Sequence, residues 1–274
     1  MKNKSIVMKI LIIGSFVLFL LLLVVIFSFV QMLVPKKEKK ETKKIITNNY
    51  SLTDINNISF DFKKSNSIFK VSEDENLVIV QNSKEDRFYL NYKQKGKQIH
   101  FTEDSYIINP QKKKYTIYIP KSYLGKITIV NGFGKIDIEE IDNDIDINNN
   151  SGEIVLEEVK NTKIKDVSGN ISIKNVLGDI KVSSSTGDII IDNIEGSINA
   201  ETITGNIEVT KFMVAGDSSF ENVSGDIIIR VKEKAICKIN AVNETGKTKI
   251  SNKTCDSEIN ILNIKNVTGA ISVY

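Results

Sequence analysis

The residue types that most often build metal centres and catalytic triads are scarce in this sequence. Tryptophan is absent, histidine occurs once and cysteine twice among 274 residues. The single histidine, His100, lies in the alternating stretch KQIHF, with no second histidine or cysteine at ligand spacing. Neither a zinc site nor a catalytic triad is therefore predicted, and we expect His100 to lie on the surface of a strand.

Arginine is equally rare, because Arg87 and Arg230 are the only two. They leave few side chains for planar, bidentate contacts with phosphates or bases. Lysines are concentrated before residue 45, and from there onward acidic residues outnumber basic ones. A mildly acidic folded part argues against nucleic acid as a partner.

The longest uncharged stretch runs from residue 10 to 34, ILIIGSFVLFLLLLVVIFSFVQMLV. At helical rise it is long enough to cross about 30 Å of hydrocarbon with some tilt, and it exceeds the apolar core of a typical signal peptide. We predict an N-terminal transmembrane anchor at 1–34, in contact with the lipid bilayer through residues 10–34, and a lysine-rich linker at 35–44. The lysines after the span favour a cytoplasmic domain, but this rule is weaker for long domains, so both orientations stay open.

A short phrase with glycine, then alternating polar and apolar residues, recurs through the second half of the chain, as in SGNISI, TGDIII and SGDIII. Such alternation is typical of a strand with one buried face. Within each of two interleaved series the glycines lie 17 to 20 residues apart: Gly134, Gly152, Gly169, Gly187, Gly205 and Gly225, and Gly178, Gly196 and Gly216. Two phrases would then form one coil. The predicted fold is all-β, a single-stranded β-helix or solenoid of parallel strands with about 18 residues per coil.

The predicted solenoid repeats occupy residues 121–274. Residues 45–120 lack the glycine phrase but keep strand-like alternation, for example in RFYLNYK and KKYTIYIP. We predict that they form a more aromatic β section that covers the first open edge of the solenoid. The opposite edge, expected at Ile271–Tyr274, is predicted to be uncapped and open to self-association.

The stretch AVNETGKT, residues 241–248, approaches the spacing of a phosphate-binding loop. Such a loop needs a buried strand before it and a helix N-terminus after it. Here Gly246 opens another repeat phrase, and the turn-like SNKTCD follows. The repeat therefore explains the motif, and no nucleotide is predicted as a partner.

Three further patterns allow a chemical and a structural interpretation. Calcium-binding rolls need paired glycines and an aspartate, whereas this chain has one glycine per phrase, directly followed by Asp179, Asp188 or Asp226, so we expect a solvated polar column. The acidic pairs Asp137 with Glu139 and Asp144 with Asp146 have a spacing that glycosidases use, but they also suit a soluble sheet surface. Cys237 and Cys255 lie about one coil apart at different places in the phrase, and we expect two thiols. No catalytic, metal or cofactor-binding residue is predicted.

The whole arrangement resembles a known bacterial family. A single span, a lysine-rich linker, the lead-in KKYTIYIPKSYLGKITIVNGFGKIDI and the repeated SGNISI and TGDIII phrases are similar to the "putative adhesin" family, over roughly residues 45–274. The resemblance implies a β-strand-repeat domain without established activity, displayed outside the cytoplasmic membrane. It supplies no catalytic residue.

We therefore predict a single-pass cell-membrane protein whose non-enzymatic solenoid acts as an adhesin-like element and binds cell-wall polymer or another envelope protein. Columns of Asp, Asn, Ser and Lys at fixed spacing would suit many weak contacts with a repetitive partner. Two alternatives remain. One is a cytoplasmic, membrane-attached scaffold of the bactofilin type, and the other is a regulator in a cell-envelope stress-response pathway.

Overall fold

The computed structural model describes residues 44–83, 87–104, 113–232, 237–251 and 260–274. The predicted membrane anchor, and the predicted linker up to residue 43, lie outside these ranges. Within them, no helix has the length and apolar character needed to span a bilayer. The compact unit that begins at Lys43 consists of strands, turns and loops.

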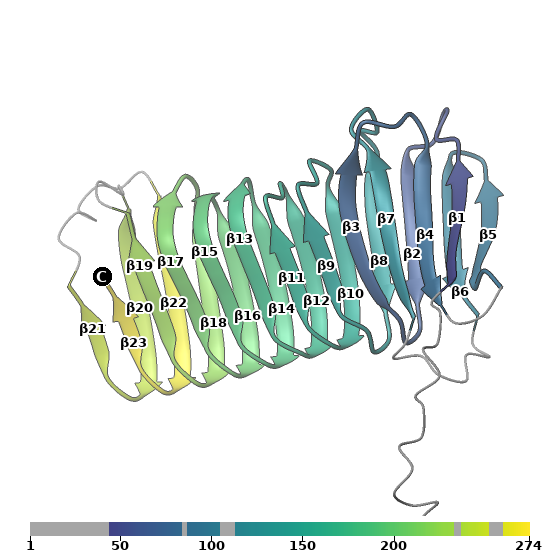
Figure 1. Ribbon diagram of the computed structural model, residues 1–274. Coiled ribbons are helices and arrows are strands. Elements are labelled where there is room, and N and C mark those ends of the chain that lie inside the picture. The colour runs from purple at the N-terminus through teal and green to yellow at the C-terminus, as the bar shows by residue number, and fades with distance from the viewer. Residues whose placement is uncertain (1–43, 84–86, 105–112, 233–236, 252–259) are drawn as a thin grey trace, which may run out of the picture. The chain divides into compact units, whose positions relative to one another are not determined.

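Two sheets face each other along the unit (Figure 1). The first has twelve strands, in the spatial order β1 (Lys44–Tyr50), β4 (Leu77–Ser83), β7 (Lys114–Pro120), β3 (Asn66–Ser72), β9 (Ile136–Glu139), β11 (Ile154–Glu157), β13 (Ile171–Leu177), β15 (Ile189–Gly196), β17 (Ile207–Val214), β19 (Ile227–Val231), β23 (Ile271–Val273) and β21 (Thr248–Ile250). The second has eleven, in the order β20 (Lys238–Thr245), β22 (Ile261–Thr268), β18 (Ser218–Ser224), β16 (Ile198–Thr204), β14 (Ile180–Thr186), β12 (Thr162–Ser168), β10 (Ile145–Ser151), β8 (Lys126–Asn131), β2 (Asn57–Phe62), β6 (Gln98–Glu103) and β5 (Leu90–Lys95).

Successive coils stack in the register that the repeat predicts. Ile171 of β13 pairs with Ile189 of β15, which pairs with Ile207 of β17, so equivalent residues recur every 18 positions. Each coil contributes one strand to each sheet, and the strands within the solenoid are parallel. The predicted all-β solenoid is therefore confirmed, with two mostly parallel sheets.

The alternation of side chains also follows the prediction. Ile171 and Ile173 are buried between the sheets, whereas Ser172 between them faces outward. The inward aliphatic side chains of neighbouring coils form one continuous core. Burial of these columns supplies the apolar stabilisation that a lone coil lacks, which is why the coils stack.

Glycines at the turn from the second sheet to the first form the column that the longer of the two series predicts. Gly187 lies directly over Gly169, and a Cβ atom at Gly187 would meet the carbonyl oxygen of Gly169 far inside van der Waals distance. Its φ of 136° is also unfavourable for any other residue. Both the close approach and the backbone conformation therefore require glycine at this turn.

The N-terminal section shares both sheets with the repeats. β2 pairs with β8 and β3 with β9, so the first coil of the section stacks directly on the solenoid. The chain then continues outward through β4 to β7 before it returns to β8. Unlike the parallel strands predicted and found in the solenoid, β1, β4 and β5 pair antiparallel at this end. Stacked aromatic rings such as Phe60 and Phe101 fill its core.

The opposite end differs from the prediction. β22 and β23, the last strands in sequence, insert between the coil of β18 and β19 and the coil of β20 and β21. The predicted edge at Ile271–Tyr274 is therefore wrong, because Ile271 and Val273 are buried. The outermost strands are β20 and β21 (Figure 1). The sequences of β20 and β21 match the repeat less well than those of β22 and β23, which occupy the inner position.

Candidate functional site

The stretch that approaches a phosphate-binding loop forms part of the terminal coil. Residues Ala241–Thr245 belong to β20, Gly246 makes the turn with a φ of 141°, and Thr248 begins β21. Thr248 pairs with Ile271 of β23, so the residues after the glycine continue as a strand. A phosphate-binding loop uses the free backbone N–H groups at the N-terminus of a helix. A strand offers no such row of N–H groups at its start.

The other residues singled out in the sequence are dispersed. His100 is exposed on β6, as predicted, and Cys237 is buried at the start of β20, whereas Cys255 lies outside the described residues. Glu139 forms an ion pair with Lys70 at 2.6 Å, and Asp146 forms one with Lys126 at 3.0 Å. One member of each acidic pair thus forms an ion pair with a neighbouring strand on the outer face of its sheet.

The polar residues after the glycines connect one coil to the next. The Asp188 Oδ1 atom accepts a hydrogen bond from the backbone N–H of Asn206 at 2.8 Å, and Asn206 Oδ1 accepts one from the N–H of Asp226 at 2.9 Å. Asp179 Oδ1 accepts one from the N–H of Ser197 at 3.0 Å at the opposite turn. Each side chain therefore satisfies a backbone donor of the following coil. Among the described residues, no group of three or more His, Cys, Asp and Glu side chains could hold a metal ion.

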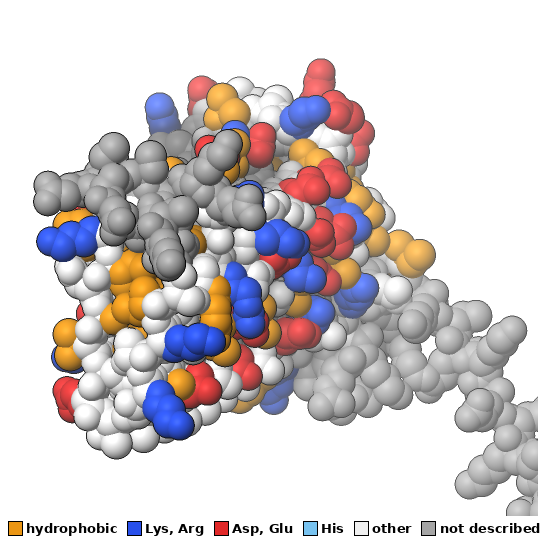
Figure 2. Space-filling view, turned by 90° about the vertical axis from the view of Figure 1, so that its left-hand side faces the viewer, with side chains coloured by type: hydrophobic (Ala, Val, Ile, Leu, Met, Phe, Trp, Pro, Cys, Tyr) orange, Lys and Arg blue, Asp and Glu red, His pale blue; other side chains and the backbone are white. Residues whose placement is uncertain are grey.

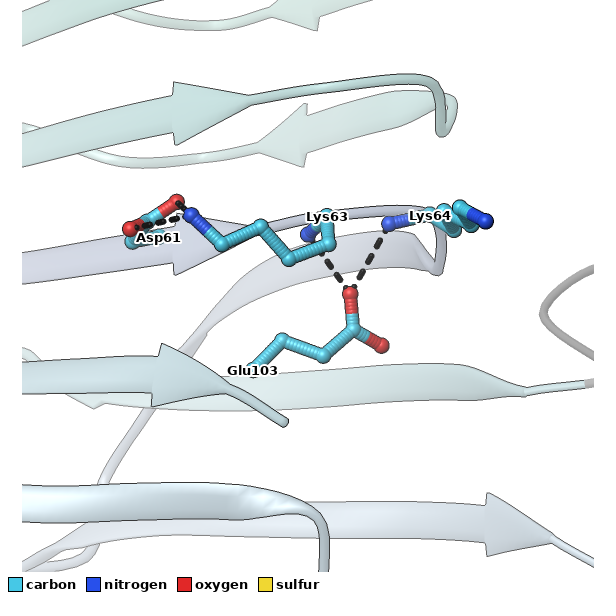
Figure 3. Close-up of polar contacts among 4 residues, drawn as sticks. All are labelled: Asp61, Lys63, Lys64 and Glu103. Carbon is cyan, nitrogen blue, oxygen red and sulfur yellow. Dashed lines mark hydrogen bonds and ion pairs between the residues drawn. The ribbon is translucent and has the colours of Figure 1, made fainter. Parts of the chain in front are cut away.

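One buried carboxylate lies in the N-terminal section. Glu103 of β6 is 1% exposed, and its Oε2 atom accepts hydrogen bonds from the backbone N–H groups of Lys63 at 2.7 Å and Lys64 at 2.9 Å (Figure 3). Its other oxygen accepts one from the hydroxyl of Ser65, which is fully buried. These bonds close the turn between β2 and β3. Because both side chains are buried, they stabilise the turn and do not meet a substrate.

A column of buried polar side chains runs along the second sheet, one per coil at the same inward position. Asn131 Nδ2 donates to Asn149 Oδ1 at 2.6 Å, Asn149 Nδ2 donates to Asp166 Oδ1 at 2.6 Å, and Ser184 Oγ donates to Asp166 Oδ2 at 2.8 Å. Burial raises the pKa of the Asp166 carboxyl, although the hydrogen bonds from Ser184 and Asn149 counteract this shift. The column continues through Thr202, Asn222 and Asn266.

Beside this buried column runs a second column of exposed hydroxyl groups. Seven serines and threonines occupy the position before the glycine in seven stacked coils and pair in register: Ser151, Ser168, Thr186, Thr204, Ser224, Thr268 and Thr245. All are exposed except Ser151, which is half-buried. Neighbouring strands lie about 4.8 Å apart, so the column offers donors and acceptors at a fixed repeat along the solenoid.

A hollow of about 350 Å³ lies on the second sheet, lined by residues that come just before the hydroxyl column in each strand and by none of the column's own members. Its apolar lining comes from three aligned side chains, Ile203, Val223 and Val267, and Ile203 is 55% exposed. Glu201, Glu221 and Lys265 contribute charges. We call the hydroxyl column and the hollow formed by the preceding residues the hydroxyl strip.

Polar columns were predicted from the sequence, but this column of hydroxyl groups was not. The signal was present, because most phrases begin with Ser or Thr before their glycine, as in SGN, TGD and TGN. Turn chemistry alone accounts for a small polar residue at this place. Only the observed register shows that these residues belong to one column on one face.

Stacked two-strand coils, polar turn ladders and the glycine column define a β-solenoid. Comparison with known families then assigns the chain: the model of the Toastrack DUF4097 family matches residues 31–270, and the chain belongs to this family. The description of this family names no activity. No curated protein matches the chain significantly.

Solved structures of putative adhesins resemble the chain at low sequence identity. One from Bacteroides fragilis is 18% identical with a TM-score of 0.38, and the match covers 85% of this chain and 99% of that chain. One from Parabacteroides distasonis is 14% identical with a TM-score of 0.38, and the match covers 84% and 97%. A putative cell adhesion protein from Clostridium sporogenes is 12% identical with a TM-score of 0.31, and the match covers 85% and 99%.

Proposed function

We propose that this chain is a membrane-anchored, non-enzymatic element that binds a repetitive, hydroxyl-rich polymer of the bacterial cell envelope, such as a wall glycan. The observation that carries the proposal is the in-register column of exposed Ser and Thr side chains beside the hollow. A polymer laid along the solenoid would meet an equivalent hydroxyl at every coil. Many weak hydrogen bonds then add up to useful avidity.

The character of the hydroxyl strip supports a neutral polar ligand. Serine and threonine hydroxyls both donate and accept hydrogen bonds, as sugar hydroxyls do. The aliphatic base formed by Ile203, Val223 and Val267 suits the apolar face of a sugar ring. Glu201, Glu221 and Lys265 of the hollow add acceptors and a donor at its margin.

The uncharged run at residues 10–34 supports the membrane anchor, and the resemblance to adhesins supports an extracytoplasmic solenoid. A cytoplasmic scaffold is the second candidate, and the open end formed by β20 and β21 favours it. Protease treatment of intact cells distinguishes the two locations. A solenoid protected from protease would exclude binding to wall polymer.

Binding is tested by cosedimentation of the detergent-solubilised full chain with purified insoluble cell wall. A variant that combines Thr186→Val, Thr204→Val and Thr268→Val keeps the shape of each side chain but removes three hydroxyls. We expect the dissociation constant to rise at least about tenfold, because each lost hydrogen bond contributes about 0.5–1.5 kcal/mol.

The matched control is Thr116→Val, which removes a half-buried hydroxyl from β7 in the other sheet. It should bind as the unmodified chain does. Equal binding of the triple variant would refute the hydroxyl strip as the site. No sedimentation of the unmodified chain would refute wall polymer as the partner.

A further inference from the structure

The end of the solenoid formed by β20 and β21 carries two edge strands side by side. On their inner side both are hydrogen-bonded: the backbone N–H of Lys238 donates to the carbonyl of Asn260 at 2.7 Å, and that of Ser251 donates to the carbonyl of Val273 at 2.9 Å. On their outer side no strand of the described residues pairs with them. Each edge therefore presents a row of backbone groups that can pair with another chain.

The apolar columns of the core continue to this end. Ile239 and Ala241 of β20 lie in register with the buried Leu262 and Ile264, yet both are only half-buried. In β21, Ile250 lies in register with the buried Val273 and is 46% exposed. Figure 2 looks onto this end and shows hydrophobic side chains at the surface. Among the described residues, no further layer covers the inward positions of this last coil, as one covers those of each internal coil.

The inward face of these edge strands carries no charged side chain that would oppose an apolar contact. Proteins protect edges with proline, bulges or charged side chains, lysine above all. The inward positions of β20 and β21 carry Ile239, Ala241, Asn243, Thr248 and Ile250, none of which is charged or proline. The charged side chains of these strands, Lys238, Glu244 and Lys249, lie at the alternate, outward positions.

We propose that this end is the interface of a homodimer in which two solenoids meet end to end. A partner must supply two strands one sheet-to-sheet distance apart, about 10 Å, with apolar side chains between them. A single extended peptide would pair with only one edge, whereas a second copy of the same end supplies both strands and the apolar layer. A two-fold axis that runs across the two sheets pairs β20 with β20 and β21 with β21, both antiparallel, and closes the assembly.

The test is the molar mass of the full chain in detergent, measured by light scattering over a range of concentrations after correction for the micelle. The unmodified chain should be a dimer that dissociates on dilution. Ala241→Lys places a charge at an inward position of β20 and should raise the dimer dissociation constant at least about tenfold. Val242→Lys adds the same charge at the neighbouring, 60% exposed position on the outer face, and it should leave the dimer intact.

Ile250→Lys is a second variant at a side chain that is already half exposed, so it should fold even if Ala241→Lys does not. Circular dichroism and thermal unfolding establish which variants are folded. A monomeric unmodified chain at every concentration would overturn the proposal. Undiminished association of both folded inward variants would overturn it as well, because the contact would then lie elsewhere. Wall binding through the hydroxyl strip is a separate property and does not affect either result.

Discussion

At the residue scale, the close spacing of the coils depends on the absence of side chains in the glycine column. At Gly187 the missing side chain lets the chain pass directly over the carbonyl of Gly169. The obstructing atoms belong to the backbone, which cannot move aside without breaking the hydrogen bonds of the ladder. A side chain at this turn therefore disturbs two coils and both sheets.

We expect Gly187→Ala to lower the free energy of unfolding by about 2–4 kcal/mol, because it combines a steric clash with an unfavourable φ. Chemical denaturation followed by circular dichroism measures the change. Gly96→Ala is the matched control: Gly96 has a φ of 57°, but nothing lies within 4 Å of a Cβ atom built there. It should cost only about 1 kcal/mol. Equal losses in the two variants would contradict a special role for close stacking.

At the scale of the element, β12 contributes the one ionisable side chain, Asp166, to the column of buried polar residues described above. Asp166 is 6% exposed, and burial raises its pKa above the ordinary value of 3.8. The protonated form of the carboxyl is therefore more favoured in the folded chain than in the unfolded chain. Stability from this group is fully present below the ordinary pKa and is lost as the pH rises through the raised pKa.

Asp166→Asn should consequently stabilise the chain at neutral pH, because the amide oxygen can still accept from Asn149 and the amide nitrogen can donate to Ser184. The gain over the unmodified chain should shrink as the pH falls and should disappear at about pH 3, where both side chains are neutral. Thermal unfolding at several pH values measures it. A gain that stayed constant with pH would exclude ionisation as the cause.

The elements also show what the sequence could and could not predict. Alternation in β13 and β15 and the two glycine series correctly predicted strands, coil length and register, because each depends on contacts that repeat along the chain. The place of β22 and β23 could not be predicted in this way. The phrases at 238–250 and 261–273 are similar, so either could follow β19, and only the packing of whole coils decides between them.

The candidate site was only partly predictable for the same reason. Asp188 and Asp226 were expected to form a solvated polar column, but they bond the backbone of neighbouring coils. Thr204 is an ordinary turn residue in the sequence, but in the structure it belongs to the exposed hydroxyl column. The sequence gives the type of side chain at each position. Its role depends on the residues that lie one coil away, which the sequence does not place.

At the scale of the whole molecule, the coil is the unit that can be added or removed. Equivalent residues of β15 and β17 lie 18 positions apart, and each internal coil contacts the coil before it and the coil after it. Stability of such arrays rises with each complete unit, because the added coil increases the number of interfaces by one and exposes no new surface at the ends.

Duplication of residues 187–204 should therefore give a folded chain with a thermal stability no lower than that of the parent. Duplication of residues 187–195 alone inserts half a coil, which puts later strands in the wrong sheet and breaks the glycine column. It should fold poorly or not at all. Circular dichroism and small-angle scattering measure both outcomes, and equal folding of the two insertions would contradict a two-strand coil as the unit.

The inner position of β22 and β23 has a consequence for biosynthesis. The residues that separate β18 and β19 from β20 and β21 are translated after both of these coils. The coil of β20 and β21 thus has no permanent neighbour until β22 and β23 have been synthesised. Growth of the solenoid can follow the order of synthesis up to β19, but beyond that point the order of stacking departs from it, and a nascent chain that stalls before β22 lacks both terminal layers.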